Sequence, residues 1–151
     1  MQQIFDITRT SRKILSQYLE NYSLEQLNKV PEGFNNNLIW NIAHIIVIQQ
    51  RLAYKASGLP LNISKEMEDK YNIGSRPLAD VTQEEVEEIR SLLFETINQT
   101  KADYNNGVFK NYYEFTNGLG FTIRNIEDAL GFNNYHEATH FGIMMSIKKF
   151  I

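Results

Sequence analysis

The chain has 151 residues, of which 42% are hydrophobic and 12% aromatic, and its 15 basic and 18 acidic residues give a net charge of −3. This length fits a single domain over residues 1–151, which can remove roughly 70% of its unfolded surface from water. The charges are mixed along the chain and offer a polyanion no basic face, so we expect no nucleic-acid partner. The chain has no cysteine, which excludes disulfides, thiolate metal ligands and a cysteine nucleophile.

No stretch of the sequence is apolar enough to cross a membrane. The longest apolar run, residues 38–48, is interrupted by Asn41 and His44 and falls short of the roughly 20 residues that a spanning helix needs. The N-terminal residues contain no apolar signal region and include Asp6. We therefore expect no membrane partner and a cytoplasmic location.

The first predicted helix covers residues 4–22, where apolar residues recur mostly at three- and four-residue steps. A short helical turn follows from Ser23, and Gln26 completes a possible capping box. The second main helix spans residues 37–57. It begins at one of three consecutive asparagines, any of which can cap it, and it stops at Gly58. Because this helix is apolar on two sides, we expect it to be central in the fold.

The connection after the second helix, residues 61–77, is long and shows no consistent period. It contains one predicted helical turn at residues 65–70. Loops of this length in compact domains are usually crossovers, lids or mobile segments. A third helix begins at Thr82, which forms a capping box with Glu85, and it continues to about Tyr104.

Residues 108–121 predict a short hairpin or an irregular aromatic loop, and no real sheet. Asn125 can cap a last helix that runs to the end of the chain, with a candidate break at Gly131. The prediction is therefore an all-α protein, a four-helix bundle with a long connection between its second and third helices.

The three histidines of the chain fall in two of the predicted helices. His136 and His140 would lie about 40° apart around the helix axis and about 6 Å along it, so both imidazoles can reach one ion. His44 lies in the second helix, which a bundle can bring alongside. Any one of them alone is more simply a hydrogen-bonded core residue. Three neutral imidazoles clustered in a bundle interior would be costly to leave unpaired, and a zinc, nickel or iron(II) ion would give all of them a partner.

The segment from His136 to His140 also matches H-E-x-x-H, the zincin motif, in which Glu137 is the general base. Zincins take their third ligand downstream, and no histidine or carboxylate side chain follows His140 here. Metal binding with His44 as the remaining ligand therefore fits better than metalloprotease chemistry. Three roles stay open for Glu137: a fourth ligand, an acceptor for a histidine N–H, or a surface charge.

Three other side chains are candidates for the lining of a pocket beside the metal. Trp40 and Tyr135 lie near the histidines in the sequence, although aromatic residues at helical spacing are more often part of a core. Arg51 lies two turns beyond His44 on the same helix face, where it suits a substrate carboxylate or, equally, a solvated salt bridge.

The order and spacing of these motifs resemble the DinB-like superfamily, also called the DinB/YfiT-like metalloenzymes. The resemblance rests on N-x-x-W-x-x-x-H at residues 37–44, on H-E-x-x-H-x-G at residues 136–142, and on the lead-in at residues 126–132. It implies an up-down-down-up four-helix bundle, a divalent metal held by His44, His136 and His140, and frequent homodimers. Related proteins include thiol-dependent S-transferases that use bacillithiol or mycothiol-type cofactors, and a maleylpyruvate isomerase.

Two hypotheses about function follow. In the first, the protein is a metal-dependent enzyme, a thiol-dependent S-transferase or a hydrolase, in which zinc or nickel acts on a thiol, water or carbonyl of a small-molecule substrate. A low-molecular-weight thiol is then a second cofactor. In the second, the bundle is not catalytic, and the site has a structural role or senses a small ligand. No substrate-binding residue can be matched to the superfamily, and no catalytic residue beyond the candidate Glu137 is identified.

Overall fold

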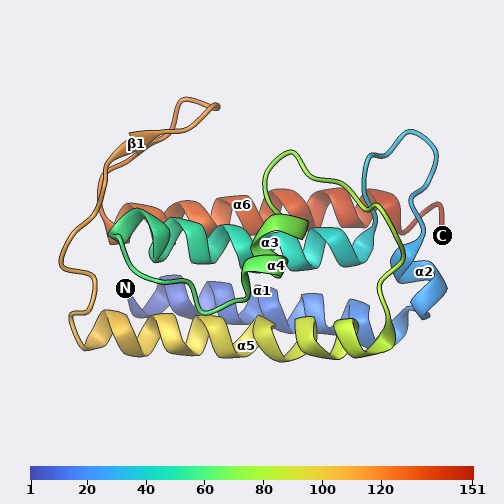
Figure 1. Ribbon diagram of the computed structural model, residues 1–151, viewed down its shortest axis with the longest axis horizontal. Coiled ribbons are helices and arrows are strands. Elements are labelled where there is room, and N and C mark those ends of the chain that lie inside the picture. The colour runs from blue at the N-terminus through green and yellow to red at the C-terminus, as the bar shows by residue number, and fades with distance from the viewer.

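In the computed structural model, which describes residues 1–151, the chain is mostly helical, as predicted. Four long helices lie side by side along the longest axis (Figure 1): α1 (Gln2–Asn21), α3 (Leu38–Ala53), α5 (Gln83–Asn105) and α6 (Ile126–Ile147). Helix α3 packs against α5 and α6, and α1 packs against the same two helices. In Figure 1, α1 and α6 run from left to right, whereas α3 and α5 run from right to left.

Side-chain caps fix where these helices begin. The Asn37 side chain accepts a hydrogen bond from the Trp40 N–H at the start of α3, so the third of the three asparagines is the cap. Thr82 and Asn125 cap α5 and α6 in the same way. The predicted second helix changes form near its end, because the α-helix stops at Ala53 and a 3₁₀ turn, η1 (Lys55–Ser57), completes it.

The predicted break at Gly131 is wrong. Helix α6 runs unbroken from Ile126 to Ile147. A glycine inside a helix costs only about 1 kcal/mol relative to alanine. The neighbouring side chains of Ala129, Leu130 and Asn133 are buried on the helix, so packing against the rest of the bundle outweighs that cost.

The connections also follow the predicted pattern. The short helix α2 (Leu24–Asn28) carries both hydrogen bonds of the predicted capping box. The predicted helical turn in the long connection is α4 (Lys65–Lys70). Between α5 and α6, β1 (Phe115–Thr116) and β2 (Thr122–Ile123) form an antiparallel hairpin with two residues in each strand. The hairpin projects from the body of the molecule (Figure 1).

Helix α3 is the central helix of the fold. Every one of its residues except Arg51 is buried. Its aliphatic side chains contribute to both groups of buried hydrophobic residues, one at each end of the bundle. A polar side chain on α3 is therefore surrounded by protein on almost every side, so it needs hydrogen-bond partners within the protein.

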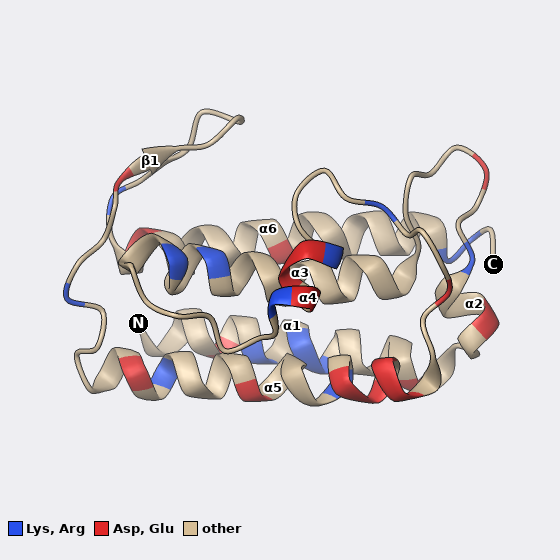
Figure 2. Ribbon diagram, in the orientation of Figure 1, with Lys and Arg blue, Asp and Glu red and all other residues tan.

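No helix of the structure combines the length and the apolar character that a bilayer crossing requires. Basic and acidic residues are interspersed on α1 and α5, α3 carries a single basic residue, α6 carries only acidic ones, and acidic residues gather in the first turn of α5 (Figure 2). The charge distribution therefore shows no extended basic face.

Candidate metal centre

The packing of α3 against α6 brings the three histidines together. The ring centroids of His44 and His140 are 4.7 Å apart, those of His136 and His140 are 4.5 Å apart, and those of His44 and His136 are 5.3 Å apart. One nitrogen from each ring lies within 4.8 Å of the other two. His44 therefore provides a third nitrogen beside those of His136 and His140 on α6.

Hydrogen bonds fix the orientation of two of the imidazoles. His44 Nδ1 lies 2.7 Å from the backbone oxygen of Tyr71, which can only accept, so Nδ1 carries the proton. His140 Nδ1 lies 2.8 Å from Asn41 Oδ1. The Asn41 amide nitrogen donates to the backbone oxygen of Asn37 and to the side chain of Asn36, which leaves Oδ1 as the acceptor. In both histidines the lone pair is therefore on Nε2, where it is free for a ligand bond.

His136 supplies an independent sign that the site is incomplete as protein alone. Its Nδ1 is buried and has no hydrogen-bond partner. A buried polar nitrogen without a partner is costly, and it is rare in native structures. A divalent ion bound at this nitrogen and shared with the other two rings would give it a partner, so this donor set fits a metal.

The surroundings keep all three imidazoles neutral, which is the state that binds metals. Burial lowers the pKa of His44, although its hydrogen bond to Tyr71 acts in the opposite direction. Burial, followed by the nearby His140, His44 and Arg12, lowers the pKa of His136 from 6.5 to about 3. Burial and then His44 lower the pKa of His140 from 6.5 to about 4. No proton therefore has to be displaced from these rings at neutral pH.

The arrangement suits a metal with an open position. Zinc–nitrogen bonds of about 2.0–2.1 Å in tetrahedral geometry separate the ligand nitrogens by about 3.3 Å, so nitrogens that now lie within 4.8 Å of one another move closer together when an ion binds. Three nitrogen ligands without a fourth protein ligand leave room for water or a substrate atom. His44 and His136 also line a cavity of about 670 Å³ that is open to solvent, which gives a small molecule a route to the site.

The family model of the DinB superfamily matches residues 7–144 of the chain, a span that contains all three histidines. The chain belongs to the DinB superfamily. A comparison with curated proteins finds no match. The resemblance inferred from the two histidine motifs is thereby confirmed at the level of the superfamily.

In this DinB superfamily member, the aromatic candidates do not line the cavity at the histidines. Trp40 stacks on the His44 ring at a centroid distance of 4.5 Å, and its indole N–H donates to Ser75 Oγ. Trp40 therefore packs against one face of the His44 ring and helps to hold the ring in place. Tyr135 is 51% exposed and packs against Phe132 and Phe121 on the outer side of α6, because it points away from its neighbour His136 around the helix.

Arg51 does line the cavity, and it also forms an ion pair. Its Nη1 donates to Glu68 Oε1 at 2.7 Å. Arg51 therefore forms a salt bridge and also lines the cavity, so the structure accommodates both of the roles considered from the sequence.

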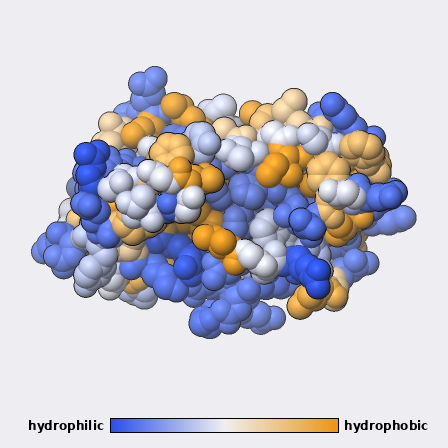
Figure 3. All heavy atoms as spheres, turned by 90° about the horizontal axis from the view of Figure 1, so that it is seen from above, coloured by the Kyte–Doolittle hydropathy of each residue, from blue (hydrophilic) through white to orange (hydrophobic).

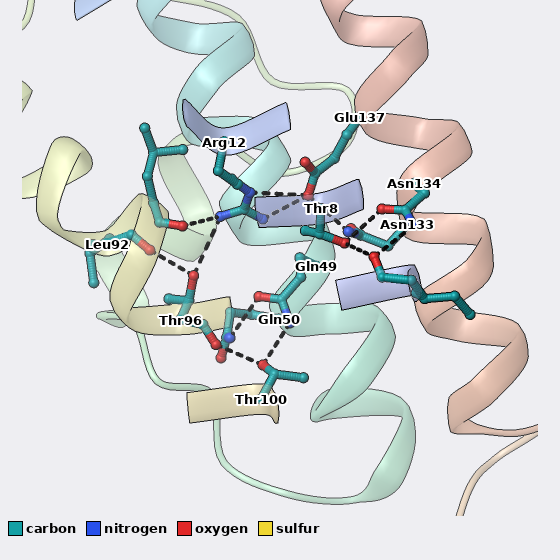
Figure 4. Close-up of polar contacts among 12 residues, drawn as sticks. Thr8, Arg12, Gln49, Gln50, Leu92, Thr96, Thr100, Asn133, Asn134 and Glu137 are labelled. Carbon is teal, nitrogen blue, oxygen red and sulfur yellow. Dashed lines mark hydrogen bonds and ion pairs between the residues drawn. The ribbon is translucent and has the colours of Figure 1, made fainter. Parts of the chain in front are cut away.

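Glu137 has a different role from each of the three considered from the sequence. It is only 1% exposed, so it is not a surface charge. Its carboxylate points from α6 towards α1 (Figure 4), where Oε1 accepts from Arg12 Nη2 at 2.9 Å and from Asn133 Nδ2 at 2.8 Å. It belongs to no potential ligand group and accepts no hydrogen bond from a histidine. The zincin role of general base therefore has no geometric basis here.

Two contributors to the site, Asn41 and Tyr71, were not assigned a role from the sequence, and neither was Arg12, the partner of Glu137. Asn41 lies near His44 on the α3 helical wheel, so its polar side chain inside an apolar helix was an available signal. Arg12 lies on the face of α1 that also carries Phe5 and Leu15, and a buried charge requires a partner. The Tyr71 contact uses a backbone oxygen, which carries no sequence signal.

Proposed function

We propose that this protein is a metal-dependent enzyme in which His44, His136 and His140 hold one divalent ion, zinc or nickel, with iron(II) as an alternative. The observation that carries the proposal is the set of three converging, neutral imidazoles, of which two have their Nδ1 protons engaged and their Nε2 lone pairs unused. We further propose that the four long helices form the up-down-down-up bundle typical of the superfamily.

The reaction we favour is attack on a small-molecule substrate by a nucleophile activated in the cavity. The nucleophile is a low-molecular-weight thiol in S-transfer, where its sulfur replaces the substrate's leaving group, or water in hydrolysis. When bound, the ion supplies Lewis-acid chemistry, which lowers the pKa of a thiol or water or polarises a carbonyl. The chain's own residues orient the ligands: Tyr71 and Asn41 hold two imidazoles in the required tautomer. The cavity next to His44 and His136 provides the space in which a small-molecule substrate meets the activated group.

The first test is metal analysis of protein purified without a histidine tag. We expect one divalent ion per chain after zinc or nickel is offered, and loss of stoichiometric binding in His44→Ala, His136→Ala and His140→Ala. Thr139→Ala is the matched control, because Thr139 is exposed on α6 between the two histidines. A wild type that binds no stoichiometric metal would overturn the proposal.

The second test separates thiol chemistry from a structural role for the metal. The metal-loaded protein is screened by thermal shift against low-molecular-weight thiols, and we expect stabilisation that disappears in His140→Ala. A metal-loaded protein that responds to no thiol rules out S-transfer. A metal that raises the melting temperature without conferring any thiol or substrate binding supports the non-catalytic alternative instead.

A further inference from the structure

The floor and the outer wall of the cavity beside the histidines come from different parts of the chain. The floor is α3, which contributes His44, Ile48, Arg51 and Leu52. The outer wall is the segment 113–119, which contains the first strand and the tip of the hairpin. The hairpin is attached at its base, where the Tyr113 N–H donates to the backbone oxygen of Ala56 at 2.7 Å. The wall is therefore present before any ligand binds.

The floor of the cavity sets the length of a ligand. His44 and Arg51 lie two turns apart on α3, which corresponds to about 10 Å along the axis and nearly the same direction around it. Ile48 lies between them on the same stripe and also lines the cavity. A molecule that reaches from the histidines to Arg51 therefore passes over an apolar surface.

The rim of the cavity indicates the character of the middle part of the ligand. Three large apolar side chains lining it are mostly exposed: Ile73 at 74%, Leu119 at 72% and Tyr113 at 68%. Figure 3 shows that hydrophobic residues gather on parts of the face seen from above. Large apolar side chains that surround a cavity and remain in contact with water are typical of a binding site for an apolar group, which would cover them.

The far end of the cavity is basic. Arg51 Nη1 and Lys55 Nζ both donate to the same oxygen, Glu68 Oε1, at 2.7 and 2.6 Å. This is the only side-chain hydrogen bond that Arg51 makes, so its other N–H groups are available. Arg51 and Lys55 both line the cavity, and the one acidic residue that does so, Glu114, lies on the opposite wall and is exposed. A guanidinium with free donors suits a carboxylate, which it can bind through two hydrogen bonds.

We propose that this cavity binds an elongated, largely apolar small molecule with a metal-binding donor at one end and a carboxylate at the other. The donor meets the histidine centre, the apolar middle lies over Ile48 beneath the hairpin, and the carboxylate binds Arg51 about 10 Å away. This inference rests on the proposed function for its donor end. The apolar middle and the carboxylate end rest on the cavity alone.

The test uses a series of ω-mercaptoalkanoic acids of increasing chain length with the metal-loaded protein, and calorimetry as the readout. We expect affinity to rise by about fourfold per methylene until the extended chain spans the distance from the histidines to Arg51, and then to level off or fall. Arg51→Gln should weaken binding of the optimal acid by at least about tenfold. It should leave the matched ω-mercaptoalcohol, which has no carboxylate, unchanged.

Two controls keep the result interpretable. Arg124→Gln removes an exposed arginine that pairs with Asp128 outside the cavity, and it should change nothing. Metal stoichiometry and melting temperature are measured on every variant, so that a folding defect is recognised.

A plain alkanoate of the optimal length is tested on the metal-free protein, where binding that depends on Arg51 supports the carboxylate end without any metal. If the protein binds metal but shows neither the chain-length dependence nor the effect of Arg51→Gln, the inference is overturned and the proposed function stands. If no metal binds, the proposed function and the donor end fail together. The alkanoate measurement then decides the carboxylate end separately.

Discussion

Two polar clusters, one buried and one partly buried, share α6 and differ in how their groups are satisfied. The first, on the side facing α1 and α5, joins Glu137 and Asn133 to Arg12, which also donates to the backbone oxygen of Leu93 (Figure 4). The second, on the side facing α3, contains the three histidines. Glu137 directly follows His136 in the sequence, yet the two side chains belong to different clusters because successive residues point about 100° apart on a helix.

In the Arg12 cluster each charge is paired with an opposite charge, whereas in the histidine cluster the imidazole lone pairs have no partner. Arg12 and Glu137 neutralise each other, although Glu137 Oε2 and Asn133 Oδ1 have no protein partner. The three histidines are uncharged groups of one kind, and their unused lone pairs cannot satisfy one another. The difference teaches that the charges of the Arg12 cluster are balanced within the protein, whereas the three imidazoles offer lone pairs that only an external partner can use.

Among single substitutions, the largest effect should come from opening the Arg12 cluster. Glu137→Ala leaves a fully buried guanidinium without its counterion, and we expect it to lower the free energy of unfolding by about 3–5 kcal/mol. The double variant Arg12→Met/Glu137→Leu should recover most of that loss, because it removes both charges together. Urea denaturation of Glu137→Ala measures the loss, and urea denaturation of Arg12→Met, Glu137→Leu and the double variant measures the coupling. A loss below 1 kcal/mol in Glu137→Ala would contradict a structural role for the pair.

Acid should act on the histidine cluster of the metal-free protein. The folded-state pKa values of His136 and His140, about 3 and about 4, lie below the ordinary value of 6.5, so the unfolded chain binds protons more readily. Their contribution is therefore complete above pH 6.5 and is lost as the pH falls towards 4, at up to about 1.4 kcal/mol per pH unit and histidine. Chemical denaturation at a series of pH values measures it. The slope should be smaller in His136→Asn, and an unchanged slope would argue against neutral, buried imidazoles.

A smaller effect is expected at the residue that orients His140. Asn41→Ala removes the acceptor of the His140 Nδ1 proton, so metal affinity should fall by about 10–100-fold while the stoichiometry stays at one ion. Competition with a chelator of known affinity measures this change, and Thr139→Ala serves again as the control. If Asn41→Ala binds metal as tightly as the wild type, Asn41 does not position the ring.

The smallest effect should come from a position on α6 that is remote from both clusters. Asn125 caps the helix by accepting from the Asp128 N–H at 2.8 Å. Asn125→Ala should cost about 1 kcal/mol of stability and leave metal affinity unchanged. Thermal denaturation and the chelator competition measure the two quantities. A drop in metal affinity would show that the helix start and the metal centre are coupled, which the comparison of the two clusters does not predict.

The sequence by itself determined the features that depend on residues within about four positions of each other. The caps at Thr82 and Asn125 follow from side chains that bond to backbone three residues ahead, whereas for α3 the sequence offered three asparagines and the structure selects Asn37. The chelating pair His136 and His140 follows from helical spacing alone. The superfamily could be recognised because its motifs are local and occur in a fixed order.

Only the tertiary structure decided which side chains meet across helices. The partner of Glu137 is Arg12, 125 positions away, and the carbonyl that orients His44 belongs to the connection after α3. These contacts depend on how far each helix is rotated about its axis and shifted along it. Packing of whole helix faces fixes that rotation and shift, and no short stretch of sequence records them. For the same reason the sequence left three roles open for Glu137, whereas the fold turns its carboxylate towards Arg12 on α1.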